Sequence, residues 1–325
     1  MKPSKVNLPY QIQSAITATL ETKKLADIKN AYNDLSYKYK KQTGSYFKSI
    51  EHCLAYLSVR APSTFGAIKN VLESLKTYSN FEDISSFLDA GAGPGCGLWA
   101  VIDNFEKLKQ TTLIEKSNLI SEIGKSILET SDYCNAESIR WIQSNLTNLN
   151  RELEPHDFVL ASYSLGETPN YLEVAESLWK LTKKWLVIIE PGDPTSFERI
   201  KKIRNYLIEK GANLAAPCPH SRDCPLSEND WCHFSQKILR SEIHRKLKSG
   251  TLSYEEEKFS YLAFTRTGLP EKLPRVIKRP IKASGHILLD LCTSTNVKRR
   301  TVSKKNKEQY RAAKRISWGD TWGFI

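Results

Sequence analysis

Four glycines crowd into seven residues of this chain, within the segment Phe87–Gly97, which reads FLDAGAGPGCG. The residues before them are apolar and typical of a buried strand, and Leu98–Leu108 is predicted to form a helix. Glycine lets the backbone turn tightly and lets a ligand approach more closely than a Cβ would allow. A strand, a glycine turn and a helix in this order predict an α/β fold with a ligand at the turn.

Short apolar strands alternate with amphipathic stretches from Ser85 onwards. This alternation predicts right-handed crossovers and a doubly wound, mainly parallel sheet. The five expected strands are Ser86–Asp89, Thr111–Glu115, Ser138–Gln143, Phe158–Ser162 and Trp185–Glu190. Two later strands of the same core are expected at Phe259–Arg266 and Gly285–Leu291.

The regions on either side of this core differ from it in hydrophobic periodicity and in composition. Residues from about 10 to 80 carry apolar side chains at helical spacing, and Ala61–Thr64 is expected to break that pattern and to cap a later helix. Ala215–Phe234 is rich in proline and cysteine and is predicted to be irregular, whereas Ser235–Lys248 and Asn306–Ile316 are predicted to be helical. We therefore expect a helical region at 1–80, a core at 81–210, a cysteine loop with the last core strands at 211–297, and a basic tail at 298–325.

Two acidic residues flank the glycine run. Asp89 lies two residues before the first glycine, where its carboxylate can bind an ammonium group, and Glu115 ends the next strand, where it can accept both hydroxyls of a ribose. Asn145 follows the third strand and can accept from an adenine amino group. This arrangement resembles the S-adenosylmethionine site of class I methyltransferases. The expected cofactor-binding residues are Asp89, Gly91, Gly93, Gly95, Glu115 and Asn145.

Other interpretations of this segment remain open. The glycines can also form a tight strand–helix turn that binds nothing. No catalytic residue is evident, because the segment Ser162–Glu167 after the fourth strand lacks the Asn/Asp-Pro-Pro-Tyr/Phe motif of amino-group methylation. Tyr163 and Glu167 are positioned to line a pocket, but neither is a compelling base.

Three of the seven cysteines, Cys218, Cys224 and Cys232, fall within 15 residues of an irregular segment. Such crowding favours a metal site over reduced core cysteines. The fourth ligand is expected from His220, His233 or Cys292. Four thiolates suit a [4Fe–4S] cluster, whereas three thiolates and a histidine suit zinc, and the spacing does not choose between them.

Positive charge is concentrated near the C-terminus. From residue 271 to the end there are 14 Lys and Arg against four Asp and Glu, a net +10 of the chain's total of +12. Aromatic residues are interleaved with these cations, a combination that suits RNA better than a tail that only aids solubility. The expected RNA-binding residues are Lys298, Arg299, Arg300, Lys304, Lys305, Arg311, Lys314 and Arg315.

The N-terminal sequence has no apolar signal core and no arginine before Arg60, and the longest apolar runs, such as Trp185–Ile189, are far shorter than the roughly 20 residues that span a bilayer. We therefore expect a cytoplasmic protein of a prokaryote, monomeric and without a membrane partner.

Several segments together resemble the small-ribosomal-subunit-associated methyltransferase-like family, which includes a mitochondrial methyltransferase-like protein and its yeast and bacterial relatives. The segments that carry the resemblance are Ala61–Ala67, Leu88–Gly97, Ser162–Glu167, Glu190–Pro194, Cys218–Phe234, Gly285–Thr293 and Trp318–Asp320. The resemblance implies a [4Fe–4S] cluster on Cys218, Cys224, Cys232 and Cys292, and binding to small-subunit rRNA during assembly of the ribosomal small subunit.

The sequence therefore predicts an S-adenosylmethionine-binding, iron–sulfur, methyltransferase-like protein that acts on or with small-subunit rRNA. One alternative is an active rRNA methyltransferase with an undefined target. Another is a zinc-stabilised RNA-binding module whose cofactor pocket is vestigial.

Overall fold

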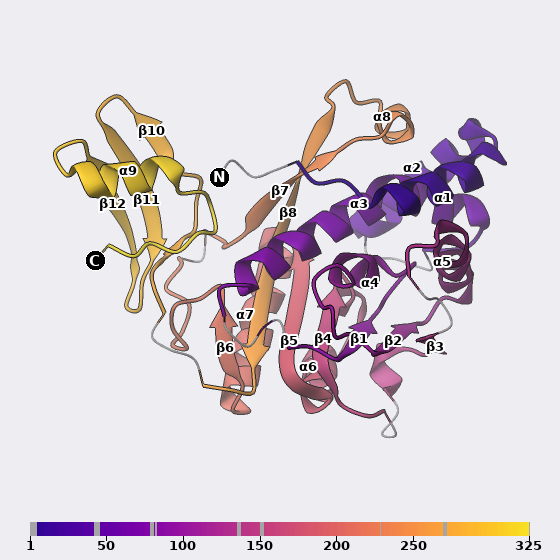
Figure 1. Cartoon of the computed structure of the whole chain (residues 1–325), viewed down its shortest axis with the longest axis horizontal. Helices are drawn as coiled ribbons and strands as arrows, with labels where there is room; N and C mark the ends of the chain where they lie inside the picture. The colour runs from indigo at the N-terminus through magenta and orange to yellow at the C-terminus, as the bar shows by residue number, and fades with distance from the viewer. Residues whose placement is uncertain are drawn as a thin grey trace.

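A mixed β-sheet forms the centre of the molecule in the computed structural model, which describes residues 5–41, 46–78, 81, 83–134, 138–149, 153–227, 229–268 and 272–324 (Figure 1). Its strands follow the order β3-β2-β1-β4-β5-β8-β6, and β7 pairs with β8. The strands are β1 Ser86–Ala90, β2 Gln110–Glu115, β3 Ile139–Gln143, β4 His156–Ser162, β5 Thr182–Pro191, β6 Asn213–Ala216, β7 Phe234–Leu239 and β8 Tyr254–Thr265.

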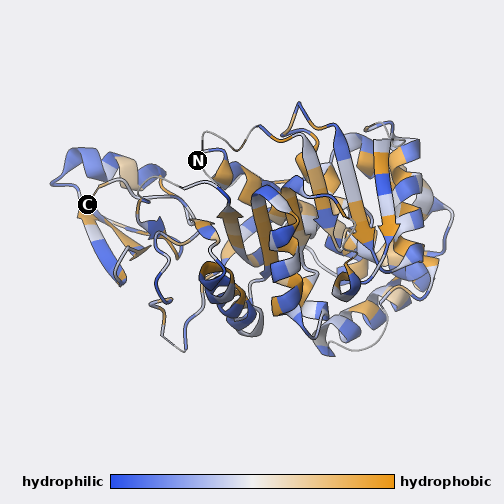
Figure 2. Ribbon diagram, turned by 90° about the horizontal axis from the view of Figure 1, so that it is seen from below, coloured by the Kyte–Doolittle hydropathy of each residue, from blue (hydrophilic) through white to orange (hydrophobic). Residues whose placement is uncertain are grey.

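The first five strands run parallel, which confirms the predicted alternation. Neighbouring residues of one strand face opposite sides of the sheet: Phe87 and Phe158 belong to one hydrophobic core, and Leu88 and Val159 to the other. Both faces are buried along most of β1, β4 and β5, which explains why these strands read as nearly continuous apolar runs. Figure 2 shows hydrophobic residues concentrated on the sheet and hydrophilic ones on the outer faces of the helices.

Helices cover both faces of the sheet. On one face lie α3 Ile50–Leu75, α4 Cys96–Val101 and α5 Asn118–Ser131, with α1 Tyr10–Glu21 and α2 Leu25–Lys41 packed outside them. On the other face lie α6 Tyr171–Lys180 and α7 Pro194–Glu209. Helix α4 is shorter than predicted, and Asn104 donates its side-chain amide to the Ala100 carbonyl near its end.

Helix α3 passes directly through the segment that was expected to break it. Pro62 lies inside the helix and is buried, so the prediction of a break and a new cap at Ala61–Thr64 is wrong. Most of α3 is buried, and a Cβ on Gly66 would come within 2.1 Å of the Ile238 side chain. Tertiary packing along this helix therefore outweighs the local cost of a proline.

The segment predicted as a helix over Ser235–Lys248 is only half helical. Its first part is strand β7, in which Phe234, Gln236 and Ile238 are buried on alternate positions, and its second part is helix α8, Glu242–Lys248. Strand β7 pairs antiparallel with the first half of β8. The alternation of burial has a period of two, which favours a strand.

A second folded unit follows β8 and lies at the opposite end of the molecule from α1 and α2 (Figure 1). It contains α9, Lys307–Arg315, and a sheet of β9 Arg275–Val276, β10 Ile281–Ala283, β11 His286–Cys292 and β12 Val297–Ser303. Its separate core is formed by Val276, Ile287, Leu289, Leu291, Val302, Ala313 and Trp322. The strand expected at Gly285–Leu291 thus pairs in this sheet and not in the main one, and the basic segment 298–325 is part of a folded unit.

The two units are joined through buried contacts. Arg275, which is 7% exposed, donates to the carbonyls of Pro217 and Gly319, at 3.0 and 2.7 Å. Trp318 packs edge-on against the His233 ring. These contacts attach the C-terminal unit to the cysteine-bearing loop. No helix in the described parts of the chain has the length and apolar character needed to cross a membrane.

Candidate functional site

A cavity of about 850 Å³ opens beyond the carboxyl ends of the parallel strands. It is lined by residues that directly follow β1, β2, β3, β4 and β5, and by side chains of α2 and α3. Ligands of open α/β sheets bind at this edge, and the volume is in the usual range of about 300–1,000 Å³ for small-molecule sites.

The glycine loop forms one wall of the cavity. Gly91 and Gly93 have φ angles of 82° and 56°, in the region that favours glycine. A Cβ on Gly91 would meet the Ser164 Cβ at 2.4 Å, whereas a Cβ on Gly93 would have only the Tyr56 hydroxyl oxygen near it, at 3.9 Å. Gly91 is therefore needed for packing, and Gly93 leaves open space above the backbone where a ligand can approach. Gly95 ends the loop as the N-cap of α4 and does not line the cavity.

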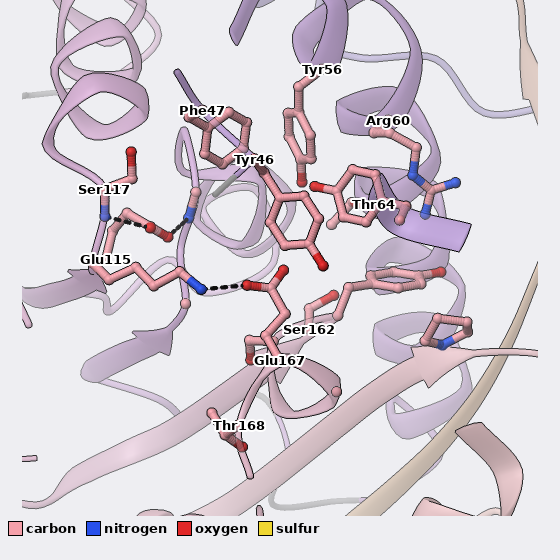
Figure 3. Close-up of a pocket in the computed structure, with 18 of the residues that line it drawn as sticks. Tyr46, Phe47, Tyr56, Arg60, Thr64, Glu115, Ser117, Ser162, Glu167 and Thr168 are labelled. Carbon is pink, nitrogen blue, oxygen red and sulfur yellow. Dashed lines mark hydrogen bonds and ion pairs between the residues drawn. The ribbon is translucent and has the colours of Figure 1, made fainter. Parts of the chain in front are cut away.

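Glu115 lies at the carboxyl end of β2 and faces the cavity (Figure 3). One carboxylate oxygen accepts from the Gly93 amide at 2.9 Å and the other from the Ser117 amide at 2.8 Å. Each oxygen retains a free lone pair, since a carboxylate can accept about four hydrogen bonds. The side chain is fixed in place and can still accept from two hydroxyl groups.

Asp89 occupies a different environment from the one expected for an ammonium ligand. It is 2% exposed, does not line the cavity, and directs Oδ2 at Gly97 of α4, where this oxygen has no hydrogen-bond partner among the described residues. Burial, and secondarily the Glu115 carboxylate, raises the pKa of Asp89 to about 8. Near neutral pH this carboxyl group is therefore mainly protonated.

Asn145 lines the cavity, as expected for the third cofactor residue. Its Oδ1 accepts from the Thr147 amide at 3.1 Å, which caps the short 3₁₀ turn Leu146–Asn148. The same oxygen keeps one lone pair for a second donor.

The loop after β4 is held by buried charges that the sequence analysis did not identify. Glu190 at the end of β5 accepts from the Leu165 amide at 3.2 Å and from Arg199 at 2.7 Å. Burial raises the pKa of Glu190 to about 7, although the guanidinium of Arg199 acts in the opposite direction. Glu190 belongs to a segment that carries the family resemblance, but nothing in one sequence pairs it with Arg199.

Tyr163 follows β4 and is held from two sides. Its hydroxyl donates to Glu257 of β8 at 3.0 Å, and the Arg60 guanidinium lies 5.5 Å from the ring centre. Its φ of 57° is unusual for a residue with a Cβ and is a form of strain that clusters at functional sites.

The four candidate metal ligands belong to two parts of the fold: Cys218, Cys224 and Cys232 lie in the loop after β6, and Cys292 ends β11. Burial, followed by the neighbouring thiols of Cys218, Cys292 and Cys224, raises the pKa of Cys232 well above its usual value. Burial also raises the pKa of Cys292 to about 12, and its Sγ lies 3.8 Å from Nε2 of His220. No group of three or more His, Cys, Asp or Glu side chains within the described ranges has the geometry to hold a metal ion. The donor set is thus chemically suitable for a metal, but its sulfurs are not arranged around a common metal position within the described residues.

A buried arginine holds the cysteine loop. Arg204 of α7 is 2% exposed and donates through Nη2 to the carbonyls of His220 and Arg222, at 2.8 and 2.6 Å. These bonds fix the part of the loop between Cys218 and Cys224.

The eight candidate RNA-binding residues are spread over the C-terminal unit. Lys298, Arg299 and Arg300 lie on β12, Lys304 and Lys305 in the turn that follows, and the rest on α9. All are exposed except the half-buried Arg300. Arg299 is engaged with Asp290 through two hydrogen bonds, and Arg300 donates to Gln309. Lys304 and Lys305 in the turn, with Arg311 and Lys314 on α9, therefore form an exposed basic surface that a polyanion can contact.

The strand order and the glycine loop define a class I methyltransferase-like α/β fold, in which one antiparallel strand is inserted between the fifth and sixth parallel ones. Within this class, the chain belongs to the family described as mitochondrial small ribosomal subunit Rsm22, whose model matches residues 50–323. This confirms the family resemblance.

Two curated relatives are similar to most of the chain. The Rsm22-cox11 tandem protein 2 of Schizosaccharomyces pombe is 26% identical over 323 residues, covering 82% of this chain and 42% of that protein. The human ribosome assembly protein METTL17 is 25% identical over 287 residues, covering 82% of this chain and 61% of that protein. The chain thus spans about half the length of these relatives. A magnesium protoporphyrin IX methyltransferase from Synechocystis, solved with S-adenosylmethionine, is 13% identical, with a TM-score of 0.40 over 75% of this chain and 97% of that one.

The comparisons contradict the expected location. Both relatives, and the similar protein of Saccharomyces cerevisiae, are eukaryotic and are named as mitochondrial. The prediction of a prokaryotic, cytoplasmic protein is therefore wrong. That prediction was based on the lack of arginine before Arg60. The composition of one short segment does not determine the location of the whole family.

The buried Asp89 predicts a specific pH dependence of stability. A folded pKa of about 8 lies above the unfolded value of about 3.9, so the folded state holds the extra proton between these values and its free energy of unfolding falls as pH rises. Replacing Asp89 with Asn should remove this contribution. Urea unfolding at pH 5, 6, 7 and 8 should show a smaller decline in the variant than in the wild type, and parallel declines would contradict the assignment.

Proposed function

We propose that this chain is an S-adenosylmethionine-binding, iron–sulfur protein that acts with small-subunit rRNA during ribosome assembly. The observation that carries the cofactor part is the open space over Gly93 beside the fixed carboxylate of Glu115. Membership of the Rsm22 family, and the names of relatives that are ribosome assembly proteins, support the assembly part.

The cofactor would be held by the chain's own groups at the strand ends. The loop from Gly91 to Gly93 would lie against the amino-acid part of the cofactor. Glu115 would accept hydrogen bonds from the ribose hydroxyls, and Asn145 would accept one from the adenine amino group. When bound, S-adenosylmethionine supplies an electrophilic methyl group. Transfer to an acceptor then requires mainly proximity and alignment, which the cavity lined by α2 and α3 would supply.

The iron–sulfur part rests on four cysteines that lie near one another, since the thiols of Cys218 and Cys224 contribute to the raised pKa values of Cys232 and Cys292. Cys218, Cys224 and Cys232 belong to the loop held by Arg204, and Cys292 ends β11 of the C-terminal unit. Cluster binding must displace the thiol protons and draw the four sulfurs together, so it would tie the C-terminal unit to the core.

The RNA part rests on the exposed cations of the C-terminal unit. Lys304 and Lys305 in the turn and Arg311 and Lys314 on α9 are all exposed. A folded, basic surface can neutralise several phosphates at once, which gives salt-dependent affinity.

Cofactor binding is tested by calorimetry with S-adenosylmethionine. Gly93→Val forces a β-branched residue to φ 56° and fills the open space, and Glu115→Ala removes the hydroxyl acceptor. Each variant should bind at least about tenfold more weakly, since hydrogen bonds to charged groups contribute about 1.5–3 kcal/mol. Glu129→Ala, an exposed acid on α5, is the matched control and should bind like the wild type. Equal affinities for all four proteins would reject the site.

The metal is tested by anaerobic purification with iron, sulfide and zinc analysis and a visible spectrum. Cys292→Ser should lose most of the iron, because one of four ligands is removed. Cys134→Ser, a half-buried cysteine of the core outside the candidate ligands, should retain it. One zinc and no iron in the wild type would favour the zinc-stabilised alternative, and full iron in both variants would exclude Cys292 as a ligand.

RNA binding is tested by the salt dependence of affinity for a small-subunit rRNA fragment. A variant with Lys304, Lys305, Arg311 and Lys314 changed to Ala should bind more weakly, with a slope shallower by about three, because up to four phosphate contacts are lost. The control changes Lys29, Lys107, Lys180 and Lys202, which are exposed lysines of the core unit, to Ala. If both variants change the slope equally, the effect is one of net charge and not of this surface.

A further inference from the structure

Part of the cavity lies beyond the glycine loop and is walled by aromatic rings. The rings that line it are Tyr39, Tyr46, Phe47, Tyr56 and Tyr163. Tyr39 and Tyr46 are stacked, with ring centres 4.3 Å apart and an angle of 11° between planes, and Phe47 meets Tyr56 edge-on at 5.4 Å. Figure 3 shows Tyr46 between Tyr56 and Glu167, near the centre of the view, whereas Glu115 lies at its left. Flat walls of this kind suit a flat ligand.

The cations in the cavity wall are already neutralised. Each of Arg60, Lys116, Arg199 and Lys248 is within 3.2 Å of a carboxylate. Their partners are Glu257, Glu167, Glu190 and Glu255, respectively. These four cations, which belong to the described lining residues, are therefore not free to bind a phosphate or a carboxylate of a ligand. The part of a ligand that enters here should be uncharged.

The same region contains a polar group without a partner. The Ser162 hydroxyl, at the end of β4, is buried and has no hydrogen bond within the described chain, and the residue is 9% exposed. It lies next to Glu167 at the cavity surface (Figure 3). A buried hydroxyl without a partner costs free energy that a ligand can recover by hydrogen bonding. The ligand should thus have a polar edge as well as flat faces.

We propose that this part of the cavity is a subsite for one unpaired nucleobase, stacked against Tyr46 and hydrogen-bonded along its edge by Ser162 and Glu167. The inference rests on the proposed function, because the cofactor would occupy the neighbouring part, next to Gly93 and Glu115. A nucleobase is flat, uncharged and polar at its edge, and its phosphates would remain outside the neutralised wall. A phenylalanine or leucine side chain would leave Ser162 unsatisfied.

The chemistry is shared by a base within an RNA strand and by a free nucleoside. The test uses a short single-stranded RNA with one 2-aminopurine, whose fluorescence falls on stacking, and separately 2-aminopurine riboside. Both are titrated with protein saturated with S-adenosylhomocysteine, so that the cofactor part is filled. Binding of the RNA alone identifies a base in a strand, and equal binding of the riboside identifies a free nucleoside. Either outcome supports the subsite.

Three variants separate the subsite from general effects. Tyr46→Leu removes a stacking wall and should weaken the quenching titration at least about fivefold, since base–aromatic stacking is a substantial contribution to binding. Ser162→Ala removes the edge hydrogen bond with little change in packing and remains informative if Tyr46→Leu fails to fold. Tyr37→Leu, an exposed tyrosine on the same α2 helix as Tyr39, is the control and should not change the titration.

The outcomes distinguish this inference from the proposed function. If S-adenosylhomocysteine binds but neither probe is quenched, or if both Tyr46→Leu and Ser162→Ala titrate like the wild type, the subsite is refuted and the cofactor site stands. If S-adenosylhomocysteine does not bind, the cofactor proposal fails. The same titrations without it then decide the subsite, and quenching that Tyr46→Leu weakens would still support it.

Discussion

Strand β8 is the element on which most of the architecture depends. It is inserted antiparallel between β5 and β6 and also pairs with β7, so it joins the parallel strands to β7 and to helix α8 between β7 and β8. Its first half carries Glu255 and Glu257, which do not line the cavity themselves but bind side chains that do. Glu257 binds Arg60 of α3 and the Tyr163 hydroxyl, and Glu255 binds Lys248 of α8. One strand thus fixes the sheet order, the position of the long buried helix and one side of the cavity.

The parallel core was readable from the sequence because its central strands β1, β4 and β5 are buried on both faces and therefore appear as apolar runs between amphipathic helices. The same reasoning failed for strands in which burial alternates from residue to residue and for strands that are very short. Strand β7 is apolar only at every second residue and resembled one face of a helix, and β9 and β10 are too short to give a pattern. Pro62 was taken as a break because local propensity is visible in a sequence, whereas the packing that overrides it is not.

The site was predictable only where one stretch of chain contains its parts. The positions of Gly93 and Glu115 at the cavity followed from a strand–turn–helix pattern, and both line it. Asp89 belongs to the same motif, yet its side chain is buried against Gly97 of α4 and does not reach the cavity. The direction of a side chain in a buried strand depends on the helices packed on each face, which one sequence does not show. The tyrosines of α2 and the Arg60–Glu257 pair were missed, since their partners are far away in the sequence.

The neutralised cavity wall has a consequence for how this family can change over time. Removing one member of a buried ion pair leaves an uncompensated charge that costs about 3–5 kcal/mol, whereas replacing both members by apolar residues can be nearly neutral. Glu190 is 1% exposed and Arg199 11%, so a change at either position strongly favours a compensating change at the other. The pair of Arg60 and Glu257 is under a weaker form of this constraint, because the Arg60 side chain is 33% exposed and solvent screens its charge. Substitutions at these positions should therefore be correlated across descendants of a common ancestor, even though almost 200 residues separate the second pair along the chain.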